Sequence, residues 1–333
     1  MSSPLELLSP EARAALRPEP YPTWVAPMLA TLTDRPFSRK GWVFERKLDG
    51  ERVLAFRRGR DVRLLSRNRK SIDAAYPEIA EAIASEGLHD EVLDGEVVAF
   101  VRGVTSFAAL QPRMQVRSAA QARASGVKVY YYVFDLLHLD GYDTTGLPLL
   151  ERKRLLRPAI RWGSPIRFTT HRATNGTDFL AEACEKGWEG LIAKRGDAPY
   201  QHRRSTDWLK FKCSREQEFV VGGFTDPKGS RVGFGALLLG YYDGGKLRYA
   251  GDVGTGFDRE TLLRLRDRLS PLEQDRPAFE RDGLPRSGVH WVRPELVAQV
   301  AFTEWTRDGK LRHPRFKGLR RDKRARDVVR ERP

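Results

Sequence analysis

Cysteine is scarce in this sequence. Among 333 residues only Cys184 and Cys213 occur, far apart and not in a C-x-x-C pair. Two cysteines cannot build a four-cysteine zinc module, and they do not make a disulfide framework. Because an unpaired cysteine usually behaves as a small buried apolar residue, we expect both side chains to be free thiols with a structural role.

Long apolar runs are also missing. No stretch approaches the roughly 18 apolar residues that cross a membrane, and residues 1–20 contain acids and prolines where a signal peptide needs an apolar core. The sequence therefore predicts a soluble cytoplasmic protein. An apolar fraction of 40% and seven tryptophans argue against a disordered chain, and 333 residues are enough for two domains with separate cores.

Acidic residues are outnumbered, since 59 Lys and Arg stand against 44 Asp and Glu and give a formal charge of +15. Two segments hold all of the excess. Residues 39–70 carry 12 basic and 4 acidic side chains, and residues 310–332 carry 11 and 3. Although a charged run is often only a solvated face, two such runs near opposite ends of the chain favour a polyanionic partner such as nucleic acid.

Strand-like and helix-like segments alternate through about residue 213. Apolar patterns predict strands within 42–56, 62–66, 91–100 and 127–139, with the Asp-Gly pair at 49–50 as a turn signal inside the first of these ranges. Apolar residues at three and four spacing predict helices at 71–87 and 177–188.

From residue 219 the pattern changes to short β runs separated by glycine turns, with one helix-like insert at 259–269. Several short strands with a single helix predict a small barrel of the OB type, a fold common in nucleic-acid-binding proteins. The polar stretch 212–218 is the best candidate for the boundary between the two parts.

The strongest local signal is the segment Lys47-Leu-Asp-Gly50-Glu-Arg52. A lysine at the end of a strand, before a turn where Gly50 permits close backbone approach, is well placed together with Arg52 to meet a phosphate. An ordinary lysine is protonated at neutral pH, so a nucleophilic role requires desolvation or neighbouring cations. A solvated surface lysine is the alternative interpretation.

At these residues the sequence resembles the ATP-dependent DNA ligases, within the wider group of lysine nucleotidyltransferases. K-L-D-G-E-R fits the nucleophile motif K-x-D-G-x-R, and six further motifs follow in the family's order. They are SRN at 66–68, LDGE at 93–96, YVFDLLHLDG at 132–141, WEGLIAKR at 188–195, WLKFK at 208–212 and RRDK at 320–323. Seven motifs in one order are too many to arise by chance.

The C-terminal half resembles the bacterial end-joining ligases, namely the ligase domain of ligase D and the stand-alone ligase C. This likeness rests on FTDPKGSRVGFG at 224–235 and AFTEWTRDGKLRHPRFKGLRRDK at 301–323. Only about 20 residues precede the catalytic domain, and the length leaves no room for a polymerase or phosphoesterase domain, so we expect a stand-alone enzyme. NAD-dependent ligases are disfavoured because they carry a four-cysteine zinc finger.

The resemblance implies an α+β fold in three parts. A short N-terminal extension covers residues 1–20. An adenylation (nucleotidyltransferase) domain of antiparallel sheets with flanking helices covers 21–215, and a C-terminal OB-fold β-barrel covers 216–333.

The resemblance also assigns roles around the nucleotide. Lys47 attacks the α-phosphate of ATP, releases pyrophosphate and becomes lysyl-AMP. Glu45 lies two residues earlier on the same strand face, in the neighbourhood that contacts adenine, and an exposed strand glutamate is the alternative. Arg52 and Arg67 bridge ribose and phosphate oxygens with their planar guanidinium groups.

Two glutamates and one aromatic residue complete the expected nucleotide pocket. Glu96 and Glu189 offer hard oxygen ligands that suit Mg²⁺ or Mn²⁺, although Glu96 is also a candidate for the ribose hydroxyl. Phe134 is the ring on which adenine stacks, although the strand pattern alone would place it in the core. The expected cofactors are therefore ATP and a divalent metal ion.

Basic residues further along the chain are expected to contact phosphates. They are Arg204, Lys210 and Lys212, although His202 stands where the family commonly has glycine. Arg320 and Lys323 of the last motif orient the departing pyrophosphate when the C-terminal domain closes, and the domain then reopens to engage DNA.

The implied activity is the sealing of 5′-phosphate and 3′-hydroxyl nicks in duplex DNA, through lysyl-AMP and DNA-adenylate, in DNA repair. We expect nicked duplex DNA and Ku-type or other repair proteins as partners, a monomer, and a bacterial cytoplasmic location that is nucleoid-associated on DNA. One alternative is an RNA ligase or an mRNA-capping nucleotidyltransferase, which shares K-x-D-G-x-R. Another is a non-catalytic OB-type binding protein with a dead nucleotide pocket, against which intact Lys47, Glu189 and Lys210 argue.

Overall fold

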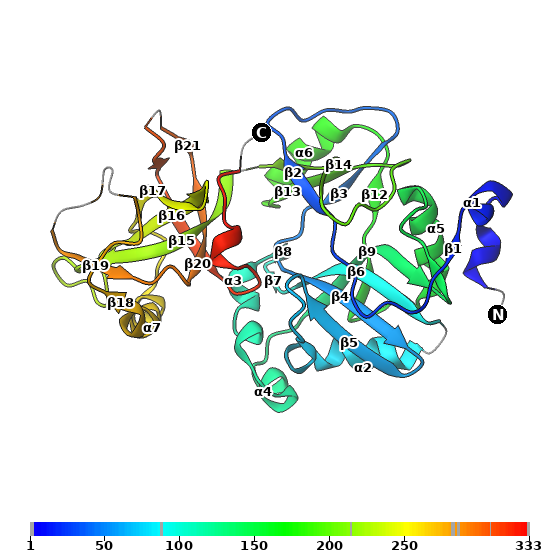
Figure 1. The fold of residues 1–333 in the computed structure, drawn as a ribbon, viewed down its shortest axis with the longest axis horizontal. Helices are drawn as coiled ribbons and strands as arrows, with labels where there is room; N and C mark the ends of the chain where they lie inside the picture. The colour runs from blue at the N-terminus through cyan, green and yellow to red at the C-terminus, as the bar shows by residue number, and fades with distance from the viewer. Residues whose placement is uncertain are drawn as a thin grey trace. The chain divides into compact units, whose positions relative to one another are not determined.

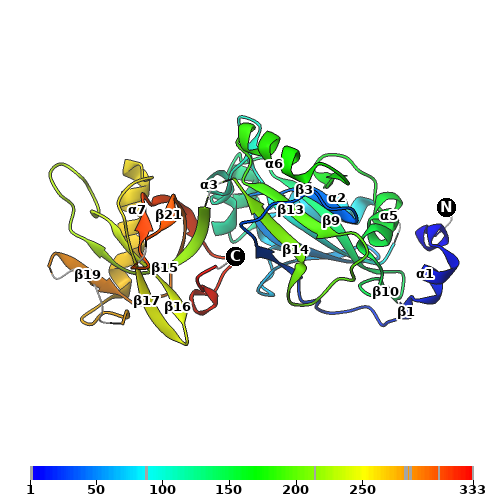
Figure 2. The ribbon, with the colours of Figure 1, turned by 90° about the horizontal axis from the view of Figure 1, so that it is seen from above.

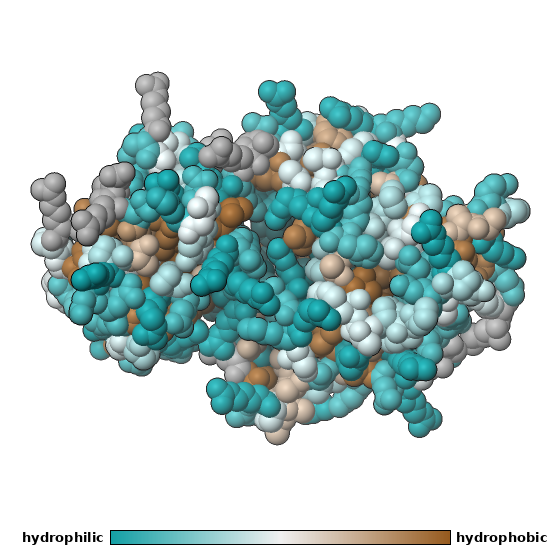
Figure 3. Space-filling view, viewed as in Figure 1, coloured by the Kyte–Doolittle hydropathy of each residue, from teal (hydrophilic) through white to brown (hydrophobic). Residues whose placement is uncertain are grey.

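The computed structural model describes residues 3–86, 89–213, 215–280, 284, 287–306 and 308–331. The chain divides into two compact units, Met1–Cys213 and Ser214–Arg332. Both units combine sheets with helices, which confirms the predicted α+β class (Figures 1 and 2). No helix in the described ranges is long and apolar enough to cross a membrane. Hydrophilic residues cover most of the face seen in Figure 3.

The first unit is built on two mostly antiparallel sheets. The first sheet runs in the order β1 (Arg17–Pro18), β10 (Tyr142–Asp143), β9 (Tyr130–Leu139), β6 (Glu91–Val98), β4 (Glu51–Arg58), β5 (Asp61–Ser66), and β11 (Ile166–Phe168) pairs with β9 in parallel. The second sheet runs in the order β12 (His171–Arg172), β3 (Trp42–Arg46), β13 (Gly190–Arg195), β14 (Arg204–Lys212), β2 (Leu29–Leu32). A small hairpin joins β7 (Phe100–Val101) and β8 (Val104–Thr105).

The first unit also contains helices. They are α1 (Pro10–Ala14), α2 (Pro77–Glu86), α3 (Phe107–Leu110), α4 (Ala119–Ala124), α5 (Leu149–Ala159) and α6 (Gly176–Glu185). The first sheet, α2 and α5 enclose one apolar core, and α6 packs on the second sheet through Phe179 and Ala183 (Figure 2). The α-helix expected at 71–87 begins only at Pro77, after a 3-10 turn at Asp73–Ala75, because proline fits the first helical position and disfavours a helical conformation of the residue before it.

A further apolar cluster links the two sheets. It includes Leu54, Phe56 and Val92 from the first sheet together with Trp208 from the second, and all four side chains are buried. Burial of one large apolar side chain stabilises a fold by roughly 1.5 to 3 kcal/mol, so this cluster contributes substantially to holding the two sheets together.

The segment 47–50 does not close a hairpin, contrary to the turn expected at Asp49-Gly50. It connects β3 in the second sheet to β4 in the first (Figure 1). Each strand has other partners: β3 pairs with β12 and β13, while β4 pairs with β5 and β6. Glycine is required at position 50 by the packing of the chain itself, since a Cβ there would lie 2.1 Å from the carbonyl oxygen of Val97.

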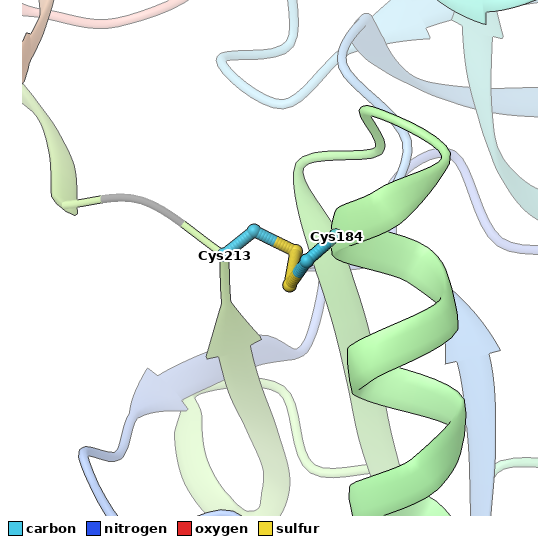
Figure 4. The surroundings of a disulfide bond; sticks show 2 residues. All are labelled: Cys184 and Cys213. Atoms are coloured by element: carbon cyan, nitrogen blue, oxygen red, sulfur yellow. A yellow bond between two sulfur atoms is a disulfide. The ribbon is translucent and has the colours of Figure 1, made fainter.

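The two cysteines form a disulfide, so the expectation of free thiols was wrong. Cys184 lies in the last turn of α6 and Cys213 directly follows β14 (Figure 4). Because α6 packs on the second sheet, the two Cα atoms lie 5.3 Å apart although 29 residues separate them. The backbone NH of Cys213 also donates to the carbonyl of Glu189, over 3.1 Å. The spacing of cysteines along a sequence indicates only local pairs such as C-x-x-C. Here the packing of α6 on the second sheet brings two distant cysteines together.

The second unit has the OB fold predicted for it. Its strands are β15 (Arg215–Thr225), β16 (Leu237–Asp243), β17 (Lys246–Val253), β18 (Glu273–Gln274), β19 (Val289–Val292), β20 (Val297–Phe302), β21 (Glu304–Trp305), β22 (Leu311–Arg312) and β23 (Arg315–Arg320). The long strand β15 pairs with β16, β19 and β20, and Gly244-Gly245 form the turn between β16 and β17 with positive φ angles.

The helix expected at 259–269 is present as α7 (Arg259–Leu269). Its cap is local, because the Asp258 side chain accepts a hydrogen bond from the backbone NH of Thr261. Leu262, Leu265 and Leu269 are buried on one side of the helix and join the core of the second unit.

Candidate active site

Lys47 stands directly after β3, an inner strand of the second sheet. Its backbone NH donates to the carbonyl of Gly190 over 2.9 Å, and its ammonium group forms an ion pair with the carboxylate of Glu189. Both side chains are largely buried, with 18% and 9% of their surface exposed. Pairing of β13 with β3 brings the two motifs together, because Leu191 lies opposite Arg46.

The charge environment of Lys47 favours its ammonium form. Burial alone lowers the pKa of this amine, but the carboxylate of Glu189 outweighs burial, with support from Asp49 and Glu96, so the pKa is raised above its usual value. In this state Lys47 is an oriented cation that must lose a proton before it can act as a nucleophile.

Arg52 projects from β4 into a buried hydrogen-bonded group. Its Nε and Nη2 donate to the two carboxylate oxygens of Asp94, each over 2.5 Å, and the hydroxyl of Tyr200 donates to Asp94 over 2.6 Å. This fork-to-carboxylate geometry orients the guanidinium group firmly. Sequence reasoning selected Glu96 and missed Asp94, although the two-residue strand period places both carboxylates on one face of β6.

Glu96 and Arg67 lie close to Arg52 in the first sheet. Glu96 is directly opposite Arg52 in the β4–β6 register, and its negative charge raises the pKa values of both Lys47 and Arg52. Ser66 is paired with Val53, so Arg67 leaves β5 at the level of Arg52. The first sheet therefore brings these three predicted residues together.

Phe134 lies on β9 at the same place, and it is 7% exposed. The Arg52 guanidinium carbon is 4.5 Å from its ring centroid, and the Lys194 ammonium nitrogen is 4.2 Å from it. Trp208 meets the ring edge-on with centroids 6.0 Å apart. Phe134 thus belongs to the core between the sheets, as the strand pattern alone predicts, and it also borders the Arg52 group. Its stacking on adenine stays a prediction.

The second sheet presents Glu45, Lys210 and Lys212 on one face. Ile192 lies opposite Glu45 on one side and Lys210 on the other, and residues directly opposite in antiparallel strands share a face. Gly190 lies opposite Lys212 in the same way. Glu45, Lys210 and Lys212 are therefore brought to the Lys47 side of the sheet, while the other face carries the apolar residues under α6.

Glu45 is buried, which excludes the exposed strand glutamate considered from the sequence. Only 2% of its surface is exposed, and its carboxylate forms ion pairs with Lys153 of α5 and Lys194 of β13, at 2.6 and 2.7 Å. Neither lysine was selected from the sequence. Lys194 could have been found by its place in the WEGLIAKR motif, whereas nothing local marks Lys153.

Arg204 lies apart from this group. It is exposed at the start of β14, at the opposite end of the strand from Lys212, and its Nη1 donates to the carbonyl of Ala30 over 2.5 Å. It lines a polar surface hollow of about 440 Å³ together with Thr31 and Gln201. The structure therefore does not bring Arg204 to Lys47.

Arg320 and Lys323 belong to the second unit, where each is paired with a carboxylate. Nε and Nη2 of Arg320 donate to Asp322 over 2.9 and 2.7 Å, and the Lys323 ammonium donates to Glu218 over 2.8 Å. Their side chains are 14% and 12% exposed. Both cations are held in defined orientations by their own unit.

The described residues contain no group of three or more His, Cys, Asp or Glu side chains that could hold a metal ion by themselves. Glu189 and Glu96 are the two residues predicted from the motifs to bind a metal ion, and both carboxylates raise the pKa of Lys47. A metal ion at this place would need further oxygen ligands from a substrate, which is how Mg²⁺ is commonly bound beside phosphates.

Comparison with known families identifies both units. Residues 27–212 match the ATP dependent DNA ligase domain, and residues 230–323 match the ATP dependent DNA ligase C terminal region. The multifunctional non-homologous end joining protein LigD of Pseudomonas aeruginosa is 40% identical over 98% of this chain, and the LigD protein of Mycobacterium tuberculosis H37Rv is 38% identical over 92%. The chain spans about 40% of the length of these relatives.

A solved structure supports the same assignment. The mycobacterial DNA ligase D complexed with ATP and MES is 37% identical, with a TM-score of 0.66, over 92% of this chain and 98% of that chain. The fold class expected from the motifs, a nucleotidyltransferase domain followed by an OB-fold domain, is confirmed by these matches. From the ordered motifs, the two matched regions and the shared fold, we conclude that this chain belongs to the ATP-dependent DNA ligase family.

Proposed function

We propose that this chain is an ATP-dependent DNA ligase that seals nicks between a 5′-phosphate and a 3′-hydroxyl in duplex DNA. The observation that carries the proposal is the buried Lys47 of K-x-D-G-x-R, which is paired with Glu189 at the end of β3 and shares the influence of Glu96 with Arg52 of the first sheet. We further propose that residues 21–215 form the adenylation domain and residues 216–333 the OB-fold domain.

In the first step, the neutral amine of Lys47 attacks the α-phosphorus of ATP. A nitrogen–phosphorus bond forms, the bond from this phosphorus to the bridging oxygen breaks, and pyrophosphate leaves with its electron pair. Arg52, Arg67, Lys210 and Lys212 supply positive charge for the phosphates, which suits a reaction that depends on positioning and charge stabilisation. Glu45 and Phe134 lie on the side where we place the adenine ring.

The residues present fit a divalent metal ion that binds together with ATP. Glu189 and Glu96 provide hard carboxylate oxygens beside Lys47, and the oxygens of the triphosphate would complete the ligand set. We propose Mg²⁺ or Mn²⁺, because both accept such ligands. The ion would supply charge neutralisation of the phosphates during the reaction.

In the later steps, AMP passes from Lys47 to the 5′-phosphate of the nick, and the 3′-hydroxyl then displaces AMP to close the backbone. Lys47 is a leaving group in the second step and no reactant in the third. The two basic segments of the chain favour binding of duplex DNA, and this binding should weaken as salt rises.

The proposal is tested by incubating the protein with α-³²P-labelled ATP and Mg²⁺ or Mn²⁺, followed by denaturing electrophoresis. We expect acid-labile, alkali-stable label on the protein, as a phosphoramidate requires, and transfer of this label to nicked DNA in a chase. The absence of label with every metal would contradict the proposal. Label from GTP alone, or transfer only to nicked RNA, would favour the capping or RNA ligase alternatives.

Replacement of Lys323 with alanine should separate the steps. We propose that Lys323 and Arg320 orient the departing pyrophosphate when the second unit closes, so Lys323→Ala should slow lysyl-AMP formation by roughly 10²-fold. Sealing of pre-adenylated nicked DNA should stay near the wild-type rate, because no pyrophosphate leaves in that step. Single-turnover assays of the two steps measure this.

The matched control for Lys323→Ala is Lys317→Ala, which removes a 45% exposed lysine of β23. It should leave lysyl-AMP formation unchanged. An equal loss of both steps in Lys323→Ala would show that this lysine does not act on pyrophosphate alone.

We also propose a role in DNA repair by end joining. The support is the likeness to relatives whose names describe non-homologous end joining proteins. A Ku-type partner, a monomeric state and a nucleoid-associated cytoplasmic location stay predictions. Co-sedimentation with a DNA end in the presence and absence of Ku, and analytical ultracentrifugation of the free protein, would test the first two.

A further inference from the structure

A row of aromatic rings and basic side chains lies at the surface of the first unit. Its members are Trp188, Arg46, Phe100, Tyr130 and Arg167, and we call it the aromatic row. All five residues are partly exposed. Large aromatic rings that stay in contact with water often mark a binding surface. The proposed reaction at Lys47 uses none of these rings, so the aromatic row calls for an explanation of its own.

Cations and rings alternate along the aromatic row. The Arg46 guanidinium carbon is 4.4 Å from the ring centroid of Trp188 and 5.7 Å from that of Phe100. The ring centroids of Phe100 and Tyr130 are 5.6 Å apart. The Arg167 guanidinium carbon is 5.7 Å from the Tyr130 centroid. Each member therefore lies next to the following one, from Trp188 to Arg167.

The β-sheet register holds most of these residues in place. Tyr130 lies opposite Val98 at the end of β6, and β7, which carries Phe100, follows after one residue. The strand β11 pairs with β9 in parallel and sets Arg167 beside Tyr132. Strands position their side chains more firmly than loops do, so the aromatic row is a preformed surface.

The rings of Phe100 and Tyr130 keep room for a planar group. Phe100 meets Tyr130 edge-on, with an angle of 75° between the ring planes, and it meets Tyr132 at a tilt of 57°. Among the described residues, no further ring is stacked face to face on Phe100 or Tyr130. A planar group that is added from solution could therefore stack on them.

Arg46 brings a positive charge that the chain itself does not compensate. Its Nε and Nη2 are buried and have no hydrogen-bond partner among the described residues. Burial lowers the pKa of this guanidinium group, and the Tyr132 side chain opposes that effect only in part. A guanidinium group in this state favours an anion nearby, and phosphate is the anion that its planar shape suits.

The chain around the aromatic row is basic as well. The segments 97–107, 126–133 and 165–168 form its surroundings on the first sheet, and they contain three basic residues and no acidic residue. The basic residues are Arg102, Lys128 and Arg167, of which the first two are exposed. The surface thus combines open aromatic rings with an excess of positive charge.

We propose that the aromatic row binds single-stranded DNA, with bases stacked on the exposed rings and phosphates held by the neighbouring cations. Aromatic side chains along a positively charged surface are the usual means of binding an unpaired strand without sequence preference. In duplex DNA the bases are stacked on one another and offer no free face to a ring. The site goes beyond the sealing of nicks, because it would hold the unpaired strand of a DNA end. The choice of DNA as the nucleic acid rests on the proposed function.

The test compares two labelled strands that differ only in their bases. One is oligothymidine of about 12 nucleotides, a length within the site sizes of known single-strand binding folds, and the other is an abasic strand with the same number of phosphates. Binding to the full chain is measured by fluorescence anisotropy at one salt concentration. We expect the Kd for oligothymidine to be lower by roughly 10-fold or more, because only its bases can stack.

Substitutions in the aromatic row separate stacking from charge. Phe100→Leu and Tyr130→Leu keep an apolar side chain but remove the ring, so each should weaken oligothymidine binding roughly 5-fold or more and leave the abasic strand unaffected. Arg167→Gln should weaken both strands equally. The matched control is Tyr142→Leu, because Tyr142 is a partly exposed tyrosine of β10, at the far end of β9 from Tyr130. It should change neither Kd.

Three results would overturn the inference. The first is equal binding of oligothymidine and the abasic strand by the wild-type protein, a comparison that stays decisive even if a variant does not fold. The second is an equal loss of both strands in Phe100→Leu and Tyr130→Leu. The third is a loss of binding to fully paired duplex DNA in these variants that matches their loss of oligothymidine binding, which would assign the aromatic row to the duplex.

Failure of this inference is distinct from failure of the proposed function. A wild-type protein that prefers oligothymidine but forms no lysyl-AMP would refute the proposed function and leave the aromatic row as a single-strand site. A protein that forms lysyl-AMP and shows no preference for oligothymidine over the abasic strand would refute only the role of the aromatic row.

Discussion

Replacing Lys47 with alanine is expected to abolish the protein–AMP adduct and the sealing of ordinary nicks. The amine is the atom that bonds to phosphorus, and no other group in the described site can replace it with comparable geometry. A loss of roughly 10⁴-fold or more is usual when a nucleophile is removed. The rate of sealing of 5′-phosphorylated nicked DNA with ATP measures the effect.

The same variant should still close a nick that already carries AMP. In that step the 3′-hydroxyl of DNA attacks, and Lys47 takes no direct part. Lys40→Ala, at an exposed lysine of the same basic segment, is the control and should seal both substrates normally. Complete loss of sealing of pre-adenylated DNA by Lys47→Ala, with normal DNA binding, would require a further role for this lysine.

The largest effect on stability is expected from Asp135→Ala. Asp135 and Arg152 are both 0% exposed, and Nε and Nη2 of Arg152 donate to the carboxylate over 2.7 and 2.9 Å. Removing the carboxylate would leave the guanidinium group buried without its counter-charge. Such a change costs about 3–5 kcal/mol of the free energy of unfolding, which urea denaturation followed by circular dichroism would measure.

Two further variants separate charge from packing in this pair. Asp135→Leu combined with Arg152→Met removes both charges and should recover much of the loss, because apolar residues of similar volume replace buried ion pairs well. Glu182→Ala breaks the exposed ion pair with Arg172 and should leave the unfolding midpoint almost unchanged. If Asp135→Ala were as mild as Glu182→Ala, the buried pair would not be an important source of stability.

Local elements were predictable from the sequence because their causes are local. The periodicity of residues 259–269 and the Asp258 cap specify α7 without help from the rest of the fold. The strand pairings were not predictable in the same way. The Asp49-Gly50 pair favoured a turn, but distant strands pair with β3 and β4 and draw them into different sheets.

The candidate site was predictable where residues occur in ordered motifs. Lys47 and Arg52 share one motif, while Glu96, Phe134 and Glu189 come from three others, and β-sheet pairing brings them into one region. Arg204 is an exception, since it lies at the far end of β14. Tyr200 and Lys153 were missed because the local sequence does not show which distant residues a side chain will contact, whereas Asp94 could have been found from its place two residues before Glu96 in the LDGE motif.

The chemical groups available to this protein can be read from its sequence: a lysine in K-x-D-G-x-R, carboxylates in the later motifs, and two basic segments suited to polyanions. The tertiary structure decided which of these groups meet. It paired Lys47 with Glu189, surrounded Glu45 with two lysines, and joined Cys184 to Cys213. The strength of an ion pair depends on separation and burial, and a disulfide requires two nearby Cα atoms, so only the fold could settle these partnerships.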